Sequence, residues 1–313
     1  MEPASLNQLT HRIPYITPAV SNANAFSVAL HMHPITLADK QLFDRYLQAY
    51  PPKISELTFT NLFSWNSVRP YYFCEFEKHL IVAFADQEGR LKFFQPVGPE
   101  PASIISLLIK TRRITSWIRM EESTIAFLSL AGCAFSADRD NWDYLYSLPE
   151  LRAIEGKKLH AKRRFINRCL EFHPVVRPMD ESMLCGCEDV CRLWLLSKNS
   201  MVDADTKPLI TALKHYKELN LSGIAVFIDN VLEAFCIGEA LNPTTFVAHF
   251  LKANMERNGL FQFTLHEFAK SIPESFVTLN QEQDLGIEGL RTAKERWYPS
   301  NFVRKYEMIS PLS

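Results

Sequence analysis

Residues 280–294 read NQEQDLGIEGLRTAK, a polar turn that leads into a predicted helix over about 287–297. A short apolar run directly before it, 276–279, is typical of a strand. Asp284 is suited to cap the helix, because a short carboxylate can accept hydrogen bonds from the free N–H groups of a first turn. The two glycines allow close approach of the backbone. The segment therefore predicts a strand-to-helix junction.

Charged side chains gather at this junction. Glu282 and Asp284 stand where acids can orient an amine or act as a base. Arg291 and Lys294 lie one helical turn apart and so share a face. The segment predicts a functional site, although helix capping and surface ion pairs would produce the same pattern.

The rest of the second half alternates irregularly between helical and strand patterns. We expect helices at 188–197, 206–219 and 259–270, and strands at 224–229, 232–237, 246–250 and 303–309. Asp229-Asn230 is a good tight-turn pair between the first two of these strands.

The first half has a similar mixture. We expect helices at 37–50, 102–111 and 151–170, and strands at 71–76, 80–85, 91–95, 114–118 and 124–128. Neither half gives a regular βαβ alternation, so we predict an α+β (mixed α/β) architecture built twice, not a Rossmann sheet. The predicted organisation is a flexible N-terminal segment over 1–34, a first domain over 35–150, and a second over 151–313.

Composition limits the classes of protein. The chain has 313 residues, 47% of them hydrophobic, and 34 basic against 35 acidic residues. These values are ordinary for a folded protein and exclude collagen-like and disordered chains. No apolar run approaches the ~18 residues of a membrane helix. The N-terminus does not resemble a secretory signal, and seven cysteines, an odd number, argue against a disulfide framework, so we expect a cytoplasmic protein.

The strongest charge anomaly lies at the start of the predicted second domain. Residues 156–168, GKKLHAKRRFINR, carry six Lys or Arg and no acid. A chain that is neutral overall has concentrated positive charge here, which favours an anion site for the phosphates of a nucleotide, a tRNA or a lipid headgroup. A solvated helix face is the alternative. The candidate anion-binding residues are Lys157, Lys158, His160, Lys162, Arg163 and Asn167.

Other motifs carry less chemistry. Cys185, Cys187 and Cys191 do not follow the Cys-x2-Cys spacing of common zinc sites, so we predict buried cysteines and no metal. No Walker loop, dinucleotide-binding loop or Gly-x-Ser-x-Gly elbow occurs. His249 lies on an apolar strand, where a hydrogen-bonded core histidine is the common case.

Over roughly 35–310 the sequence resembles the soluble C-terminal catalytic domain of phosphatidylglycerol lysyltransferases, and more closely the stand-alone members of that family. The residues that carry the resemblance are FTNLFSW at 59–65, FQPVG at 94–98, DYLY at 143–146, GKK at 156–158 with Lys162, Arg163 and Asn167, Gly238-Glu239, His249 with Lys252-Ala253, residues 280–294, Tyr298-Pro299 and Lys305-Tyr306.

The resemblance implies two tandem GNAT-like acyltransferase domains and transfer of an aminoacyl or acyl group to an amine or hydroxyl. The donor would be an aminoacyl-tRNA, as in the lysyltransferases and the Fem-type peptidoglycan enzymes, or an acyl-CoA, as in single-domain GNAT enzymes. No tightly bound cofactor is implied. Such chemistry needs an anion clamp, a group that polarises the carbonyl, and a base. The basic helix would be the clamp, Lys252 and Arg291 would polarise the carbonyl, and Asp284 or Glu282 would be the base. His249, Asn280 and Lys294 would contact substrate.

The sequence departs from the family pattern at Arg164, Leu251, Asn254 and Gln281. Either the substrate differs or catalysis is lost. The alternatives are thus a non-catalytic binding or regulatory protein that retains the fold, and an acyl-CoA-dependent N-acyltransferase that binds CoA at 254–262. The sequence has no membrane-spanning run, which makes a lipid acceptor less favoured and leaves only peripheral membrane contact.

Overall fold

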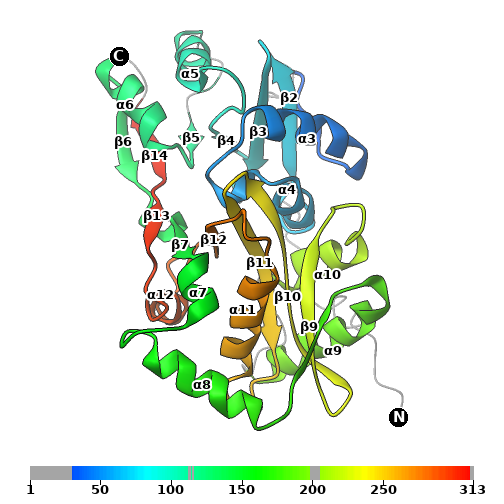
Figure 1. Cartoon of the computed structure of the whole chain (residues 1–313). Coiled ribbons are helices and arrows are strands. Elements are labelled where there is room, and N and C mark those ends of the chain that lie inside the picture. The colour runs from blue at the N-terminus through cyan, green and yellow to red at the C-terminus, as the bar shows by residue number, and fades with distance from the viewer. Residues whose placement is uncertain (1–29, 112–113, 115, 198–204, 311–313) are drawn as a thin grey trace.

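The computed structural model describes residues 30–111, 114, 116–197 and 205–310 (Figure 1). The first unit is a five-stranded sheet of order β1-β2-β3-β4-β5, in which only β4 and β5 are parallel. Its elements are β1 (His33–Pro34), α3 (Lys40–Ala49), α4 (Phe59–Trp65), β2 (Tyr71–Phe76), β3 (His79–Ala85), β4 (Leu91–Phe94), α5 (Pro101–Lys110), β5 (Trp117–Ile118), α6 (Glu122–Leu130) and β6 (Ala134–Ala137), with 3-10 turns at Leu37–Asp39 and Ser55–Leu57.

A connecting region follows the first unit and leads to the second sheet. It consists of a 3-10 turn at Arg139–Asn141, β7 (Asp143–Ser147), α7 (Leu148–Ala153) and the basic helix α8 (His160–Leu170).

The second unit repeats the element order of the first: one strand, two helices, three antiparallel strands, a helix, and a strand parallel to the last. Its elements are β8 (Val175–Pro178), a 3-10 turn at Glu181–Met183, α9 (Leu184–Ser197), α10 (Thr206–Lys214), β9 (Ser222–Ile228), β10 (Val231–Asn242), β11 (Thr245–Ala253), α11 (Leu260–Ser271), β12 (Thr278–Asn280), α12 (Glu288–Glu295), β13 (Asn301–Val303) and β14 (Tyr306–Ser310). The architecture that was predicted to be built twice is therefore visible as a repeat in the topology.

The two units exchange strands. β7, which follows the first unit, lies between β12 and β13 of the seven-stranded sheet, whose order is β13-β7-β12-β11-β10-β9-β8. β14, at the end of the second unit, pairs with β6 and meets the first sheet through reciprocal backbone bonds of 2.9 and 3.0 Å between Met120 and Tyr306. Figure 1 shows β14, in red, beside β6, and β7 next to β12. The seven-stranded sheet thus contains β7 from the first half of the chain, while β14 pairs with β6 in a separate two-stranded sheet.

A buried ion cluster lies where the exchanged strands approach each other. Lys305, directly before β14, is fully buried, and its Nζ donates to Glu56 Oε2 at 2.5 Å and to Asp143 Oδ1 at 2.6 Å. Asp143 begins β7, and Glu56 belongs to the first unit. Arg119 adds a second cation to Glu56 at 3.0 Å. The cluster thus joins three segments distant in the sequence.

Apolar packing also crosses between the units. One continuous cluster of buried residues contains Phe43 and Phe59 of the first unit together with Leu213 and Phe235 of the second. α11, with α7 and α8 beside it, covers one face of the seven-stranded sheet, and α9 and α10 cover the other (Figure 1). The two units are therefore held as one packed body.

The structure confirms the predicted α+β architecture and corrects several elements. Residues 124–128 are part of helix α6, not a strand, and the predicted closing strand is two strands, β13 and β14. The predicted helix 151–170 is broken between α7 and α8, where Ile154 and Gly156 have φ of 47° and 79°. Asp284 is not the N-cap, since Ile287 precedes the first residue of α12.

The predicted domain limits stay predictions. Residues 1–29 of the expected flexible segment lie outside the described residues, while Leu30 and Met32 are buried and β1 pairs with β2. β7 lies just before the predicted boundary at 150 and belongs to the second sheet. Within the described part of the chain, no helix is both long and apolar enough to cross a membrane.

Replacing Lys305 with methionine (Lys305→Met) leaves two buried carboxylates without their shared cation. We expect the free energy of unfolding to fall by about 3–5 kcal/mol, the usual cost of removing one partner from a buried ion pair. Urea denaturation followed by circular dichroism measures this change. Lys217→Met, at an exposed lysine, is the matched control and should shift stability by less than about 0.5 kcal/mol. A loss below about 1 kcal/mol in Lys305→Met would contradict the role given to the cluster.

Candidate functional site

The candidate site lies where β11 and β12 separate. Their parallel pairing covers only Thr245–Val247 and Thr278–Asn280. Beyond it, β11 continues to Ala253, while the chain after Asn280 turns toward the first unit. Among the described residues, no strand pairs with this edge of β11 beyond Val247, so we call it the open edge, and the turn at residues 281–284 stands beside it.

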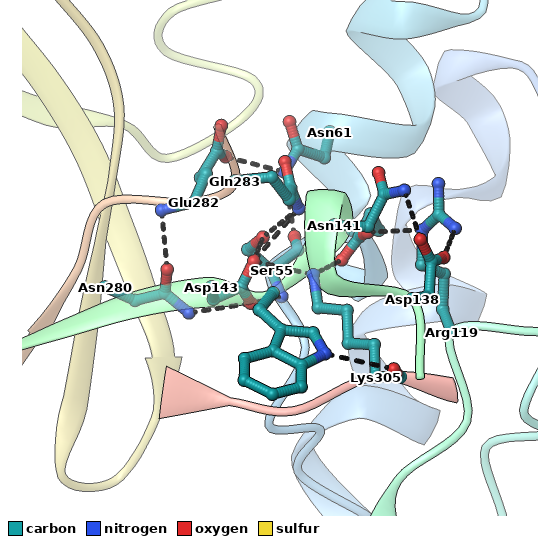
Figure 2. A network of polar contacts seen from close by, with 12 residues as sticks. Ser55, Asn61, Arg119, Asp138, Asn141, Asp143, Asn280, Glu282, Gln283 and Lys305 are labelled. Carbon is teal, nitrogen blue, oxygen red and sulfur yellow. Dashed lines mark hydrogen bonds and ion pairs between the residues drawn. The ribbon is translucent and has the colours of Figure 1, made fainter. Parts of the chain in front are cut away.

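Glu282 is held in a strained position in this turn. Its φ of 57° lies in the left-handed region, which costs energy for a residue with a side chain. Its N–H donates to Asn280 Oδ1 at 2.7 Å. Its Oε1 accepts from Asn61 Nδ2 and lies beside His249 Nδ1, each at 2.8 Å. Figure 2 shows Glu282 between Asn280 and Asn61, so residues from both units fix one carboxylate.

Lys294 fixes the same turn from α12. Its Nζ donates to the carbonyl oxygens of Gln281 and Gln283, each at 2.5 Å, and lies 5.5 Å from the centre of the Tyr144 ring. Burial lowers the pKa of Lys294 to about 8. The lysine thus clamps the carbonyl groups of the two residues on either side of Glu282.

His249 lies on β11 between two carboxylates. Its side chain is buried, with Nδ1 2.8 Å from Glu282 and Nε2 2.9 Å from Glu239 Oε1. Burial alone would lower the pKa of His249, but the hydrogen bonds to the two carboxylates prevail and raise it to about 9. The ring is therefore an imidazolium at neutral pH, with both nitrogens donating.

Asp143 connects this turn to the buried ion cluster. Its carboxylate accepts from Ser55 N at 2.8 Å, from Asn280 Nδ2 at 3.0 Å and from Gln283 Nε2 at 3.0 Å, in addition to Lys305. Figure 2 shows these side chains converging on Asp143. Asn280 Oδ1 also accepts a hydrogen bond from the Glu282 N–H. A chain of hydrogen bonds therefore runs from Lys305 through Asp143 and Asn280 to Glu282.

Asp284 has a different environment from Glu282. It is fully buried, and its carboxylate accepts from Arg291 at 2.8 and 2.9 Å, from Arg139 at 3.0 Å and from Tyr144 at 2.6 Å. Burial would raise the pKa of Asp284, but the Arg291 guanidinium and the other donors hold it well below its usual range. A carboxylate so fully engaged is better suited to anchor α12 than to accept a proton. Arg291 is in turn held by Asp284 and Asp140.

Lys252 lies away from Glu282. It is three residues from His249 on β11, beyond the irregularity in the β10–β11 register at Ile237 and Gly238. Its Nζ binds both carboxylate oxygens of Asp205 at 2.9 Å and lies 5.0 Å from the Trp194 ring centre. The structure thus brings Glu282, His249, Asn280 and Lys294 together, but not Lys252.

The basic helix α8 forms a separate surface. A surface cavity of about 420 Å³ is lined by Gly156, Lys157, His160 and Arg163 at its start. Two of the other predicted anion-binding residues contact protein groups. Lys158 forms an ion pair with Glu150 at 2.6 Å, and Lys162 lies 4.5 Å from the Trp297 ring centre. Asn167 is exposed. Burial and the neighbouring Arg296 lower the pKa of Lys162 to about 8.

The positions that depart from the family pattern do not disrupt the Glu282 turn. Arg164 is exposed on α8, and Leu251 packs against the core. Asn254 donates to Glu233 at 2.7 Å. Gln281 uses its backbone to bind Tyr144 and Lys294.

Sequence reasoning gave no role to the residues that hold the turn from a distance. Asn61, Asp143, Glu239 and Lys305 stood within the quoted segments of the resemblance, and that was their only signal. Among the residues that the structure describes, no group of three His, Cys, Asp or Glu side chains could hold a metal ion.

Comparisons with known proteins identify the family and the fold of the chain. The family described as phosphatidylglycerol lysyltransferase, C-terminal, matches residues 47–309. A conserved protein of unknown function from Bacteroides thetaiotaomicron is 28% identical, with a TM-score of 0.82 over 89% of this chain and 99% of that one. L-PGS from Bacillus licheniformis is 14% identical, with a TM-score of 0.63 over 88% and 92%.

FemX is 9% identical, with a TM-score of 0.57 over 88% of this chain and 96% of that one. No match was found among curated proteins. The structural likenesses confirm the predicted fold of tandem GNAT-like units. Since the family match covers most of the sequence, the chain belongs to the phosphatidylglycerol lysyltransferase C-terminal family.

Proposed function

We propose that the protein transfers an aminoacyl group from the ester of a charged tRNA to an amine or hydroxyl acceptor, with Glu282 as the base. The observation that carries this proposal is the strained, clamped turn that holds Glu282 beside the open edge of β11. Strain of this kind persists only where the surroundings fix it, and it concentrates at functional sites. Family membership supports the reaction class.

The chemistry needs one base and a polarised carbonyl. The acceptor nitrogen or oxygen attacks the ester carbonyl carbon and its proton passes to Glu282. As the ester bond breaks, Glu282 gives this proton to the departing ribose oxygen. Within the described residues, the Asn61 and His249 contacts use Oε1 of Glu282, and Oε2 has no protein hydrogen-bond partner. Backbone N–H groups on the open edge of β11 could stabilise the oxyanion.

Two observations favour tRNA over acyl-CoA as donor. The cationic surface on α8 is separate from the Glu282 turn, which suits a long polyanion that contacts both. At the start of α11, where the acyl-CoA alternative would bind CoA, buried Glu233 holds Asn254 at 2.7 Å and Arg257 at 3.1 Å. A Cβ on Gly259 would also lie 1.9 Å from the Phe165 carbonyl oxygen, so α8 closely covers this helix start.

The same geometry argues against a protein that has lost catalysis. Of the four altered positions, only Gln281 adjoins Glu282, and it contributes there through its backbone. The contacts of Glu282 with Asn61, His249 and Asn280 are all present. We propose no tightly bound cofactor.

Removing the charge of Glu282 should stop transfer without unfolding the protein. For Glu282→Gln we expect the transfer rate to fall by about 100-fold or more, as for loss of a general base. The assay follows labelled amino acid leaving lysyl-tRNA or alanyl-tRNA, with phosphatidylglycerol vesicles or amino-acid amides as acceptors. Glu288→Gln, at an exposed glutamate of α12, is the control. Equal rates for Glu282→Gln and wild type would show that Glu282 is not the base.

Charge reversal on α8 should weaken tRNA binding. The double variant Lys157→Glu and Arg164→Glu changes two exposed residues. We expect the slope of log Kd against log salt concentration to fall by about 2, roughly one for each phosphate contact that is lost. Lys214→Glu with Lys217→Glu, exposed at the end of α10 and beyond it, is the matched control. Binding is measured by fluorescence anisotropy, with acetyl-CoA tested separately. Acetyl-CoA binding without tRNA binding would make the donor assignment wrong.

His249 should make stability depend on pH. Its pKa is raised from 6.5 to about 9 in the folded protein, so its contribution is fully present below pH 6.5 and is lost as pH rises through about 9. We expect wild type to lose about 3 kcal/mol relative to His249→Gln across this window. The pKa of Lys294 is lowered in the folded protein, so this residue makes stability change with pH in the opposite direction. Both proteins contain Lys294, and its contribution cancels in the difference between their stabilities.

Urea denaturation at several pH values measures this difference. His160→Gln, at an exposed histidine, is the control and should follow wild type. A constant difference between wild type and His249→Gln from about pH 6 to about pH 10 would contradict the charged His249.

A further inference from the structure

A long uncharged stretch forms the outer margin of the first unit. Residues 123–137, STIAFLSLAGCAFSA, contain no charged side chain and include most of α6 and all of β6. Surface helices normally carry polar groups on their outer side. Here the outer side of α6 exposes Phe127 at 54% and Leu130 at 92%. Exposed apolar groups of this size in one place indicate a contact surface.

The strand β6 adds an open backbone edge to this surface. β6 pairs only with β14 among the described strands, so its other edge has no partner there. Asp138 N donates to Lys305 O at 2.8 Å, and alternate residues point the same way, so the N–H groups of Ala137 and Phe135 face outward. The strand has no Pro or Lys, the residues that commonly protect an exposed edge.

Apolar side chains lie beside this edge on the two-stranded ribbon that β6 forms with β14. Met308 and Phe135 point inward to the core shared with Leu128 of α6. Ile309, at the irregularity between Met308 and Ser310 of β14, is 66% exposed. We name Phe127, Leu130, Ala134–Ala137 and Ile309 the β6 edge face. Figure 1 shows α6, β6 and β14 together at one end of the molecule.

Charge distinguishes among the partners that could cover the β6 edge face. It has no cation to attract a polyanion or an anionic bilayer. A hydrocarbon interior would leave the outward N–H and C=O groups of β6 unpaired, which is unfavourable because lipid offers no hydrogen-bond partner. Around the face, the charges occur as opposite pairs, Arg304 with Glu122 at 3.2 Å and Lys92 with Glu307 at 3.6 Å. An apolar centre with a balanced polar rim is the usual anatomy of a protein interface.

We propose that the β6 edge face binds a second copy of this chain, with the two β6 strands antiparallel across a two-fold axis. Such an interface sets each patch against itself, so any net charge would repel its own copy. The uncharged β6 edge face meets this requirement. The pairing joins two two-stranded ribbons into a four-stranded sheet and satisfies the outward N–H groups of Phe135 and Ala137.

The oligomeric state of the full chain tests this proposal. Analytical ultracentrifugation over a concentration series should show a reversible dimer in wild type. Leu130→Glu should weaken dimerisation by about tenfold or more, because it sets two buried carboxylates in the interface. Leu130 is so exposed in one copy that the change should leave folding intact. Val231→Glu, at an exposed valine that begins β10, is the control and should dimerise as wild type does.

Hydrogen exchange provides a readout specific to strand pairing. The Phe135 and Ala137 amides should gain protection in the dimer, and dilution or Leu130→Glu should remove it. A wild-type protein that stays monomeric, or a dimer that Leu130→Glu leaves unchanged, would overturn the proposal. Leu130-dependent binding to neutral phosphatidylcholine vesicles by a monomer would assign the face to a membrane instead. These outcomes do not depend on transfer activity.

Discussion

The buried ammonium of Lys305 is the interaction on which the arrangement of the two units depends. It binds Glu56 of the first unit and Asp143 at the start of the exchanged strand β7, and it precedes β14, the strand exchanged in return. Burying these charges is costly unless each finds its partners. Any alternative docking of the units would leave a charge unpaired in the interior. The cluster therefore favours a single relative arrangement more than it adds net stability.

The Glu282 turn depends on that arrangement. Asn280 joins Asp143 to the backbone of Glu282, and Asn61 reaches the Glu282 carboxylate from α4 of the first unit. His249 and Lys294 come from the second unit. A single GNAT-like unit could supply only part of these contacts. This offers a physical reason for the duplication: the first unit helps to build the site in the second.

Local sequence patterns predicted most elements, because helical and strand periodicity depend on neighbouring residues. Two errors have local causes: left-handed residues at Ile154 and Gly156 break the helix predicted over 151–170, and α6 lacks the polar face that identifies a surface helix. The site was only partly predictable. Glu282 and Lys294 stood out from the local charge pattern, and His249 and Asn280 were chosen from the resemblance. The pairing of Lys305 with Glu56 spans most of the chain and leaves no local pattern.

The strand predicted over 124–128 and the β6 edge face have one origin. Without charges, this stretch carries the apolar content of a buried strand, yet only Thr124 and Leu128 of α6 are buried within one copy. Stability of the single chain does not require Phe127 or Leu130 to be apolar, since exposed positions tolerate polar residues at little cost. A composition that folding does not require points to a contact outside the fold. The error in the sequence prediction and the proposed dimer are thus two consequences of the same apolar surface.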